Sequence, residues 1–198
     1  MKIGILGAGG IGQAFAGHIA RAGFEVILSN SRGPQTLVDV ANKLGGKTRA
    51  GRREEAAQAD VVFLSVPWKQ WEAALSDLPP WNGRILIDPT NAIVFPEFRP
   101  ADLNGRTSSE VVASLAPGAR VIKACNTLDK EVLAADPHEA GGRRVLFISG
   151  DDENARKEVG GLLEKAGFAT IDLGGLKEGG KIQQFGGPLA GLNLIKLG

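Results

Sequence analysis

The chain has 198 residues, of which 23 are basic and 22 acidic, so the formal net charge is +1. This length suffices for one domain with a sizeable core, and a balanced charge without a basic stripe argues against nucleic acid or an anionic membrane surface as a partner. No apolar run is long enough to span a bilayer, and no signal peptide is recognisable. A single cysteine, Cys125, excludes an internal disulfide. We therefore expect a cytoplasmic protein.

A glycine motif follows the first predicted strand. Residues 3–6 are apolar, and Gly7, Gly9 and Gly12 then lead into a helical pattern that ends near Gly23. In such a strand-turn-helix unit the first glycine allows a tight turn, the second lets backbone approach a pyrophosphate, and the third lets the helix pack closely on the strand. Phosphates would bind at the helix N-terminus, where free amides favour anions. The motif predicts a dinucleotide site; the alternative is a glycine-rich turn without a ligand.

The stretch SNSRGP, residues 29–34, follows the second predicted strand. Asn30 lies 23 positions after Gly7, close to the spacing at which NAD-binding proteins carry an acid for the ribose. This stretch contains no acid. Asn30, Ser31 and Arg32 instead offer neutral and cationic donors, which suit a 2'-phosphate. We therefore expect a preference for NADP(H); the alternative is that Arg32 is a solvated loop charge.

Beyond residue 34, strand and helix signals alternate. Strand-like runs occur at 61–66, 84–88, 120–125, 144–149 and 169–173, with a short one near 47–50. Helical patterns cover 34–44, 52–59, 69–77, 108–116 and 152–166, with a capping box at Thr107 and Glu110. This order predicts an α/β protein with a Rossmann-type, doubly wound, mostly parallel sheet. We expect a single NADP-binding domain over residues 1–198, with a core at 1–150 and an extension with a glycine-rich tail at 151–198.

Two segments interrupt the alternation. Residues 89–106 form an 18-residue connection with three prolines, and the tail 174–198 contains eight glycines. Long irregular segments in compact domains tend to be functional or disordered. Because the tail also carries Leu189, Leu192 and Ile195, we expect it to be ordered and to pack near the site.

The residue inventory restricts the chemistry. The chain has no tyrosine, which excludes the Tyr-Lys proton donor of short-chain dehydrogenases, and one cysteine with two histidines, His18 and His138, argues against a catalytic zinc site. No metal ligands are predicted. His18 is expected to pack or to lie at the surface, and His138 to belong to a polar turn. What remains is hydride transfer between two cofactors, which requires positioning more than a strong protein acid.

Ligands of open parallel sheets bind beyond the carboxyl ends of the strands. We therefore expect the nicotinamide to lie near residues 66–68, with Trp68 and Trp71 as either a ring platform or ordinary packing aromatics. Asp88 is expected to cap a turn, and Lys123 to be a surface lysine with a buried stem. The predicted cofactor contacts are Gly7, Ala8, Gly9, Gly10, Ile11, Gly12, Asn30, Ser31, Arg32, Val66, Pro67, Trp68 and Asn91. The side expected to hold the second substrate contains Trp68, Asn126, Leu128 and Gly187.

With these residues identified, the sequence resembles the NADP oxidoreductases that depend on the deazaflavin coenzyme F420, including their bacterial NADPH-dependent F420 reductase relatives. The resemblance runs over nearly the whole chain and rests on GAGGIG, Ser31-Arg32, VPW at 66–68, TSSE at 107–110, GDD at 150–152 and GGPLAGLNL at 186–194. It implies that Ser31 and Arg32 hold the NADP 2'-phosphate and that hydride passes between nicotinamide and deazaflavin. Archaeal members often carry a histidine where this chain has Asn126, and a lysine where it has Thr36.

Three hypotheses about function stay open at this point. The first is an NADP:F420 oxidoreductase, the second an NADPH-dependent reductase of a flavin or of a small carbonyl or imine compound, and the third a non-enzymatic NADP(H) sensor. The expected partners are a small-molecule co-substrate and a second copy of the chain in a homodimer, because a site covered only by a glycine-rich tail leaves apolar surface to be closed.

Overall fold

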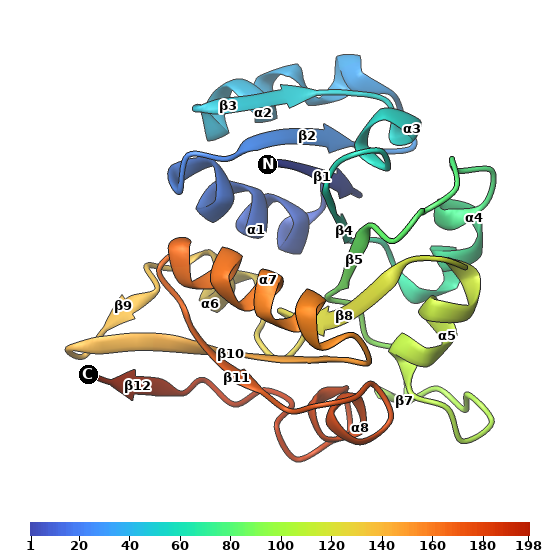
Figure 1. Ribbon diagram of the computed structural model, residues 1–198, viewed down its shortest axis with the longest axis vertical. Coiled ribbons are helices and arrows are strands. Elements are labelled where there is room, and N and C mark those ends of the chain that lie inside the picture. Colours follow the sequence, from blue (N-terminus) through green and yellow to red (C-terminus); the bar gives the residue numbers. More distant parts are fainter.

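Apolar strand runs separated by helices produce one large twisted sheet in the computed structural model, which describes residues 1–198 (Figure 1). The strands are β1 Lys2–Leu6, β2 Glu25–Ser29, β3 Lys47–Ala50, β4 Val61–Leu64, β5 Ile85–Asp88, β6 Ile93–Val94, β7 Arg99–Pro100, β8 Arg120–Ala124, β9 His138–Glu139, β10 Gly142–Gly150, β11 Ala169–Asp172 and β12 Ile195–Leu197. The helices are α1 Gly10–Arg21, η1 Pro34–Leu37, α2 Val38–Leu44, α3 Arg53–Ala56, η2 Trp68–Gln70, α4 Trp71–Leu75, α5 Ser108–Leu115, α6 Lys130–Ala134, α7 Glu153–Lys165 and α8 Glu178–Gln183.

The main sheet has the order β11-β10-β8-β5-β4-β1-β2-β3. In this order all strand pairings between β3 and β8 are parallel. The strand β10 pairs antiparallel with β8, and β11 pairs parallel with β10. The strands β9 and β12 add to the far end of β10. A mostly parallel, doubly wound sheet is thus confirmed. The carboxyl ends of the parallel strands meet at one edge, where ligands bind in such folds.

Helices cover both faces of the sheet, and this explains why its strands are apolar on both sides. On one face α1, α2, α6 and α7 pack in a core cluster that includes Ile3 and Ile5. On the other face α3, α4 and α5 pack in a second cluster that includes Leu6. Figure 1 shows α1 and α7 on one side of the sheet and α4 and α5 on the other. Alternate residues of a strand therefore point into two separate cores.

Several predicted helices are shorter in the structure. The pattern at 34–44 is divided into the 3-10 turn η1 and α2, and the pattern at 52–59 yields only α3. At 108–116, by contrast, α5 begins with the predicted capping box of Thr107 and Glu110. No helix in the structure is both long and apolar enough to cross a membrane.

The two irregular segments contain short elements that pack on each other. Residues 89–106 form the β6–β7 hairpin, and the tail forms α8 and β12. The tail contacts the sheet edge where the amide of Phe185 donates to Oδ1 of Asn91 and the amide of Gly191 donates to the carbonyl of Thr127. These bonds hold the tail against the ends of the strands, beside the edge where a site is expected.

Candidate cofactor site

The turn between β1 and α1 shows why three of its residues are glycines. Gly7 has a φ of +98°, and a Cβ there would lie 2.1 Å from the carbonyl oxygen of Ser65. A Cβ on Gly12 would lie 2.2 Å from the carbonyl oxygen of Gly7, so the helix would be pushed off the strand. A Cβ on Gly9 would meet nothing within 4 Å. Gly7 and Gly12 are therefore required by packing, whereas Gly9 leaves open space in front of the helix.

The N-terminus of α1 has anion-binding character. Gly9 is the N-cap residue, no side chain caps the helix, and no acidic residue occupies its first turn. The first amides of a helix have no partner within the helix, and the helix dipole adds a partial positive charge at this end. Free amides beside an open approach are what a pyrophosphate needs.

A cavity of about 880 Å³ begins at this glycine loop and runs along the carboxyl ends of β1, β2 and β4. Eight of the predicted cofactor residues line it: Gly7, Ala8, Gly9, Asn30, Ser31, Arg32, Val66 and Pro67. The other predicted residues, Gly10, Ile11, Gly12, Trp68 and Asn91, lie outside its lining. Sequence reasoning missed Gln35, Arg52, Arg53, Glu54, Ser65, Gln70, Ala73 and Ala74, which also line the cavity.

The SNSRGP turn is held by its own asparagine. Oδ1 of Asn30 accepts a hydrogen bond from the amide of Arg32 at 3.0 Å, and Nδ2 of Asn30 donates to Oγ1 of Thr36 at 2.9 Å. Gly33 completes the turn with a φ of +91°. The side chains of Ser31 and Arg32 are exposed at the cavity, and Arg32 forms no ion pair. Asn30 thus shapes the turn, and Ser31 and Arg32 remain available to a ligand.

The side chains of Trp68 and Trp71 differ in burial and in the contacts that they make. Trp71 is buried in the second core cluster, and its ring lies edge-on to Trp68 at a centroid distance of 6.2 Å. Trp68 is half-buried, and its Nε1 donates to the carbonyl of Ile93 at 2.7 Å. Trp71 is therefore a packing aromatic, whereas Trp68 attaches the 89–106 segment to the end of β4.

Asn91 and Asn126 meet beyond the ends of β5 and β8. Nδ2 of Asn91 donates to the carbonyl of Asn126, and Nδ2 of Asn126 donates to Oδ1 of Asn91 and to the carbonyl of Gln183. Oδ1 of Asn126 is buried without a hydrogen-bond partner. The two asparagines thus fasten α8 to the sheet edge.

Two residues predicted for the acceptor side lie in closely packed surroundings. Leu128 is buried in the core cluster that includes α1, because the chain turns inward after Cys125, whose φ is +62°. Gly187 lies at the end of α8, where a Cβ would come within 2.6 Å of the carbonyl oxygens of Lys181 and Ile182. The Leu128 side chain therefore faces the core, and the close approach of the backbone at the end of α8 accounts for a glycine at 187.

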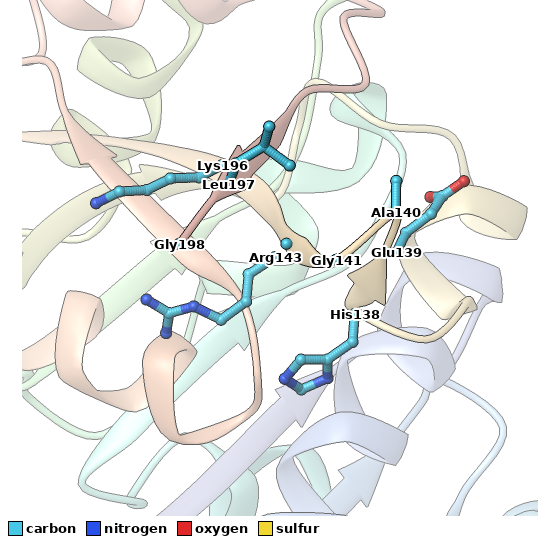
Figure 2. Close-up of a pocket in the computed structure, with 9 residues that line it drawn as sticks. His138, Glu139, Ala140, Gly141, Arg143, Lys196, Leu197 and Gly198 are labelled. Atoms are coloured by element: carbon cyan, nitrogen blue, oxygen red, sulfur yellow. The ribbon is translucent and has the colours of Figure 1, made fainter.

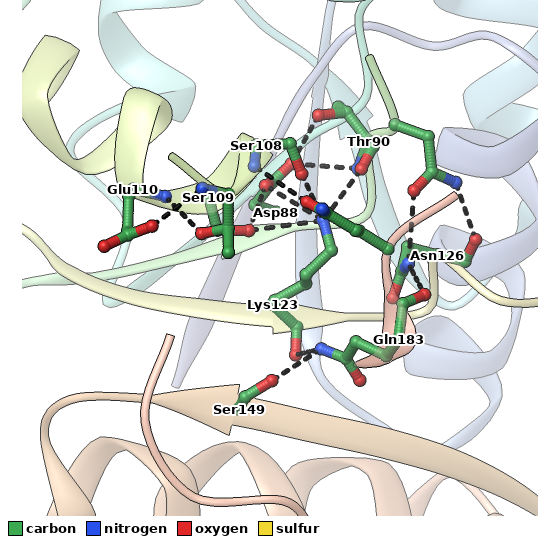
Figure 3. Close-up of polar contacts among 12 residues, drawn as sticks. Asp88, Thr90, Ser108, Ser109, Glu110, Lys123, Asn126, Ser149 and Gln183 are labelled. Atoms are coloured by element: carbon green, nitrogen blue, oxygen red, sulfur yellow. Dashed lines mark hydrogen bonds and ion pairs between the residues drawn. The ribbon is translucent and has the colours of Figure 1, made fainter. Parts of the chain in front are cut away.

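A buried polar cluster lies behind these asparagines, and we call it the polar hub; Figure 3 shows its contacts. Its members are Asp88, Thr90, Ser108, Ser109, Lys123, Ser149 and Gln183. Nζ of Lys123 donates to the carbonyl of Thr90 and to Oγ of Ser108, both at 2.9 Å, and lies 3.5 Å from Oδ2 of Asp88. Thr90 and Ser109 donate hydroxyl hydrogen bonds to the same carboxylate.

The prediction of a surface lysine at 123 is wrong, because this side chain is 0% exposed. Burial lowers the pKa of Lys123, and the attraction of Asp88 opposes that shift. Asp88, too, does more than cap a turn, since its carboxylate joins the end of β5 to α5 and β8. The sequence signal that was available is the rarity of a lysine inside an apolar strand, which requires a buried partner.

A smaller hollow of about 460 Å³ lies against β9, β10 and β12 (Figure 2). Its lining includes His138, Arg143 and Lys196, and none of the residues predicted for the site. The His138 side chain is exposed, and its ring contacts only the neighbouring Asp136 carboxylate. We therefore assign the candidate cofactor site to the larger cavity.

Several known proteins are similar to this chain in sequence and fold. The structure of a protein of Sinorhizobium meliloti, described as hypothetical protein SMa0349, is 47% identical to this chain, with a TM-score of 0.94. The match covers 99% of this chain and 96% of that one. A candidate F420-dependent NADP reductase of Arthrobacter sp. fb24 is 28% identical, with a TM-score of 0.75 over 89% of this chain and 86% of that one. A reductive aminase of Aspergillus terreus in complex with NADPH4 shares only the fold, at 19% identity, a TM-score of 0.64, and 90% and 56% coverage.

Among curated proteins, rat metalloreductase STEAP3 is 28% identical over 182 residues, which make up 92% of this chain and 36% of that protein. The chain spans about a third of the length of the metalloreductases that it matches. Residues 2–92, which contain the glycine loop and the Ser31-Arg32 turn, match the family described as NADP oxidoreductase, coenzyme F420-dependent. By the match of residues 2–92 and by its fold, the chain is similar to the coenzyme F420-dependent NADP oxidoreductases.

Proposed function

We propose that the protein transfers a hydride between NADP(H) and a planar aromatic acceptor, with the deazaflavin coenzyme F420 as the first choice. The observation that carries this proposal is the cavity of about 880 Å³ that joins the glycine loop to the Ser31-Arg32 turn. Glu54 is the one carboxylate in its lining, and Arg53 lies 3.3 Å from it in an ion pair. The cavity therefore has anion-binding groups at both ends and no free acid that would bind the ribose of NAD.

The chain's own residues provide the binding. The free amides at the start of α1 would hold the pyrophosphate, with Gly9 giving the backbone its close approach. Ser31 and Arg32 would hold the 2'-phosphate, which NAD lacks. NADPH would supply the hydride. A charge-assisted hydrogen bond contributes about 1.5 to 3 kcal/mol, so Arg32 alone favours NADP(H) over NAD(H) by roughly tenfold to a hundredfold.

Aromatic side chains at the same sheet edge support a planar acceptor. Phe95 and Phe98, on the 89–106 segment, are 65% and 61% exposed, and Phe98 lies edge-on to Phe185 at 5.1 Å. The amide of Phe185 in turn donates to Asn91 at 2.9 Å, so these rings lie beside the ends of β5 and β8. Exposed aromatic rings provide stacking and edge contacts to a flat ligand. They would form one wall of the acceptor side, next to Trp68 and Asn126.

Proton transfer has no evident donor at this edge. Asp88 and Lys123 are fully buried, and their polar atoms bond to other protein groups. Hydride exchange with a deazaflavin or flavin needs little from protein acids, because the ring systems carry the chemistry. The residues around the site would act by orienting two rings and by excluding water.

The cofactor half of the proposal is tested by calorimetry with NADP+ and NAD+. We expect the wild-type protein to bind NADP+ at least tenfold more tightly, and Arg32→Ala to remove most of that preference while leaving NAD+ binding nearly unchanged. Equal affinities of the wild-type protein for the two dinucleotides would overturn it.

The acceptor half is tested by following NADPH oxidation with coenzyme F420, with free flavin, with a small imine or ketone, and without an acceptor. We expect F420 to be reduced. If only the flavin or only the imine is reduced, the proposed acceptor is wrong, but the assignment as an NADPH-dependent reductase holds. Tight NADPH binding without turnover of any acceptor would leave a non-enzymatic NADP(H) sensor.

We also propose that the protein is a homodimer. Leu192, Leu194 and Leu197 in the tail are 41%, 40% and 68% exposed, and a second subunit would cover this apolar surface. Small-angle scattering at micromolar concentration should give the mass of two chains. The mass of a single chain would contradict the proposal.

A further inference from the structure

We propose that Arg52 is a second specificity-determining residue for the 2'-phosphate, acting together with Arg32. This inference rests on the proposed function, namely that the cavity takes the adenosine part of NADP(H). Arg52 lies in the connection between β3 and α3, outside the glycine motif and the SNSRGP turn. Both arginines line the same cavity.

The pairing of β2 with β3 brings Arg52 to the SNSRGP turn. Leu28 pairs with Ala50, and the amide of Gly51 donates to the carbonyl of Leu28 at 2.8 Å. Gly51 permits this approach, because a Cβ there would lie 2.6 Å from Cγ2 of Ile27. Arg52 is thereby held beside the end of β2, where the SNSRGP turn begins.

The charges around Arg52 leave it free for a ligand. Its neighbours are already paired, since Arg49 lies 2.6 Å from Glu55 and Arg53 lies 3.3 Å from Glu54. Nη1 of Arg53 also donates to the carbonyl of Ala73 at 2.7 Å.

Arg52 itself is exposed and forms neither an ion pair nor a side-chain hydrogen bond. In the cavity lining, Arg52 and Arg32 are therefore the two guanidinium groups without a carboxylate partner.

Two free guanidinium groups match the charge of one phosphate. A phosphate monoester carries nearly two negative charges at neutral pH, and a planar guanidinium binds its oxygens with two parallel hydrogen bonds. One arginine neutralises half of that charge. A second one, from the neighbouring connection between β3 and α3, would complete the neutralisation and would act on NADP(H) without acting on NAD(H).

The test measures binding of 2',5'-ADP and of 5'-AMP, which differ by the 2'-phosphate alone. We expect Arg52→Ala to weaken 2',5'-ADP binding by roughly tenfold or more, and to change 5'-AMP binding by less than about twofold. Arg52→Lys keeps the charge but loses the paired hydrogen bonds, so we expect an intermediate loss. Lys47→Ala is the matched control, because Lys47 is an exposed cation of the same β3 segment outside the cavity lining.

Each other result has a defined meaning. An unchanged affinity of Arg52→Ala for 2',5'-ADP would overturn the inference, and so would an equal loss for both nucleotides, which would mean that Arg52 packs on the adenine or supports α3. Either result would leave the proposed function in place, provided that the wild-type protein prefers 2',5'-ADP. A wild-type protein without that preference would overturn both the NADP(H) assignment and the role of Arg52.

Discussion

The two ends of the strand edge are built in opposite ways. At the glycine-loop end the backbone lies open, Gly9 faces empty space, and Ser31 and Arg32 are exposed beside a cavity of about 880 Å³. At the polar-hub end Lys123 and Asp88 are fully buried, and their hydrogen-bonding groups are directed at other parts of the chain. The first end is prepared for an anionic ligand, whereas the second holds the protein's own segments together.

The sequence separation of the contacts differs in the same way. The bonds that shape the SNSRGP turn join residues 2 and 6 positions apart. At the other end Gln183 bonds to Lys123 across 60 positions, and Phe185 bonds to Asn91 across 94. If the glycine-loop end binds the cofactor as proposed, cofactor affinity and fold stability depend on different ends of the edge, and variants should separate them.

The largest expected effect is on stability, from Lys123→Met. Removing the ammonium leaves the Asp88 carboxylate buried without its counter-charge, which should lower the free energy of unfolding by about 3 to 5 kcal/mol. Urea unfolding followed by circular dichroism measures it. The double variant Lys123→Met with Asp88→Leu should recover part of the loss, since no buried charge remains. A loss below about 1 kcal/mol in the single variant would contradict the importance of the hub.

A pair of glycine variants separates ligand binding from packing at the other end. Gly9→Val places its side chain in open space, so we expect nearly unchanged stability but roughly a hundredfold weaker NADP+ binding, because the branched side chain blocks the pyrophosphate. Gly12→Val collides with the carbonyl of Gly7 and should lower the free energy of unfolding by about 1 to 3 kcal/mol. Calorimetry and urea unfolding measure the two effects. Equal behaviour of the two variants would mean that Gly9 has no ligand-facing role.

The smallest effect is expected from Asn126→Ala, which acts where the two ends meet. Loss of its hydrogen bond to the carbonyl of Gln183 should lower the free energy of local unfolding of α8 by about 1 to 3 kcal/mol. We expect faster hydrogen exchange at the amide of Phe185 and slower hydride transfer, with NADP+ affinity unchanged. Lys196→Ala is the control, because Lys196 lies in the tail beyond α8 and its side chain is exposed without an ion pair. Unaltered exchange and turnover would remove Asn126 from the acceptor side.

Local sequence predicted much of the fold and half of the site. Patterns within a few residues predict the eight strands in the order β11-β10-β8-β5-β4-β1-β2-β3, the helix α7 and the capping box of α5. The short strands β6, β7, β9 and β12 were not predicted. The antiparallel entry of β10 and the short helix α6 were not predicted, because no local pattern specifies which strand a segment pairs with. Arg52 was not predicted as a cavity residue for a similar reason, because only the pairing of β2 with β3 brings it to the cavity.

The sequence by itself determined the end that we propose to bind the dinucleotide. Two features indicate this end: the spacing of Gly7, Gly9 and Gly12, and the absence of an acid around Arg32. Both depend only on residues that are neighbours in the chain, so they can be recognised without the fold. Only the tertiary structure decided that Lys123 is buried and that Asn91, Asn126 and Gln183 meet. The physical reason is that burial and pairing of these polar groups depend on which distant segments fill the space around them, and that is a property of the folded sheet and its tail.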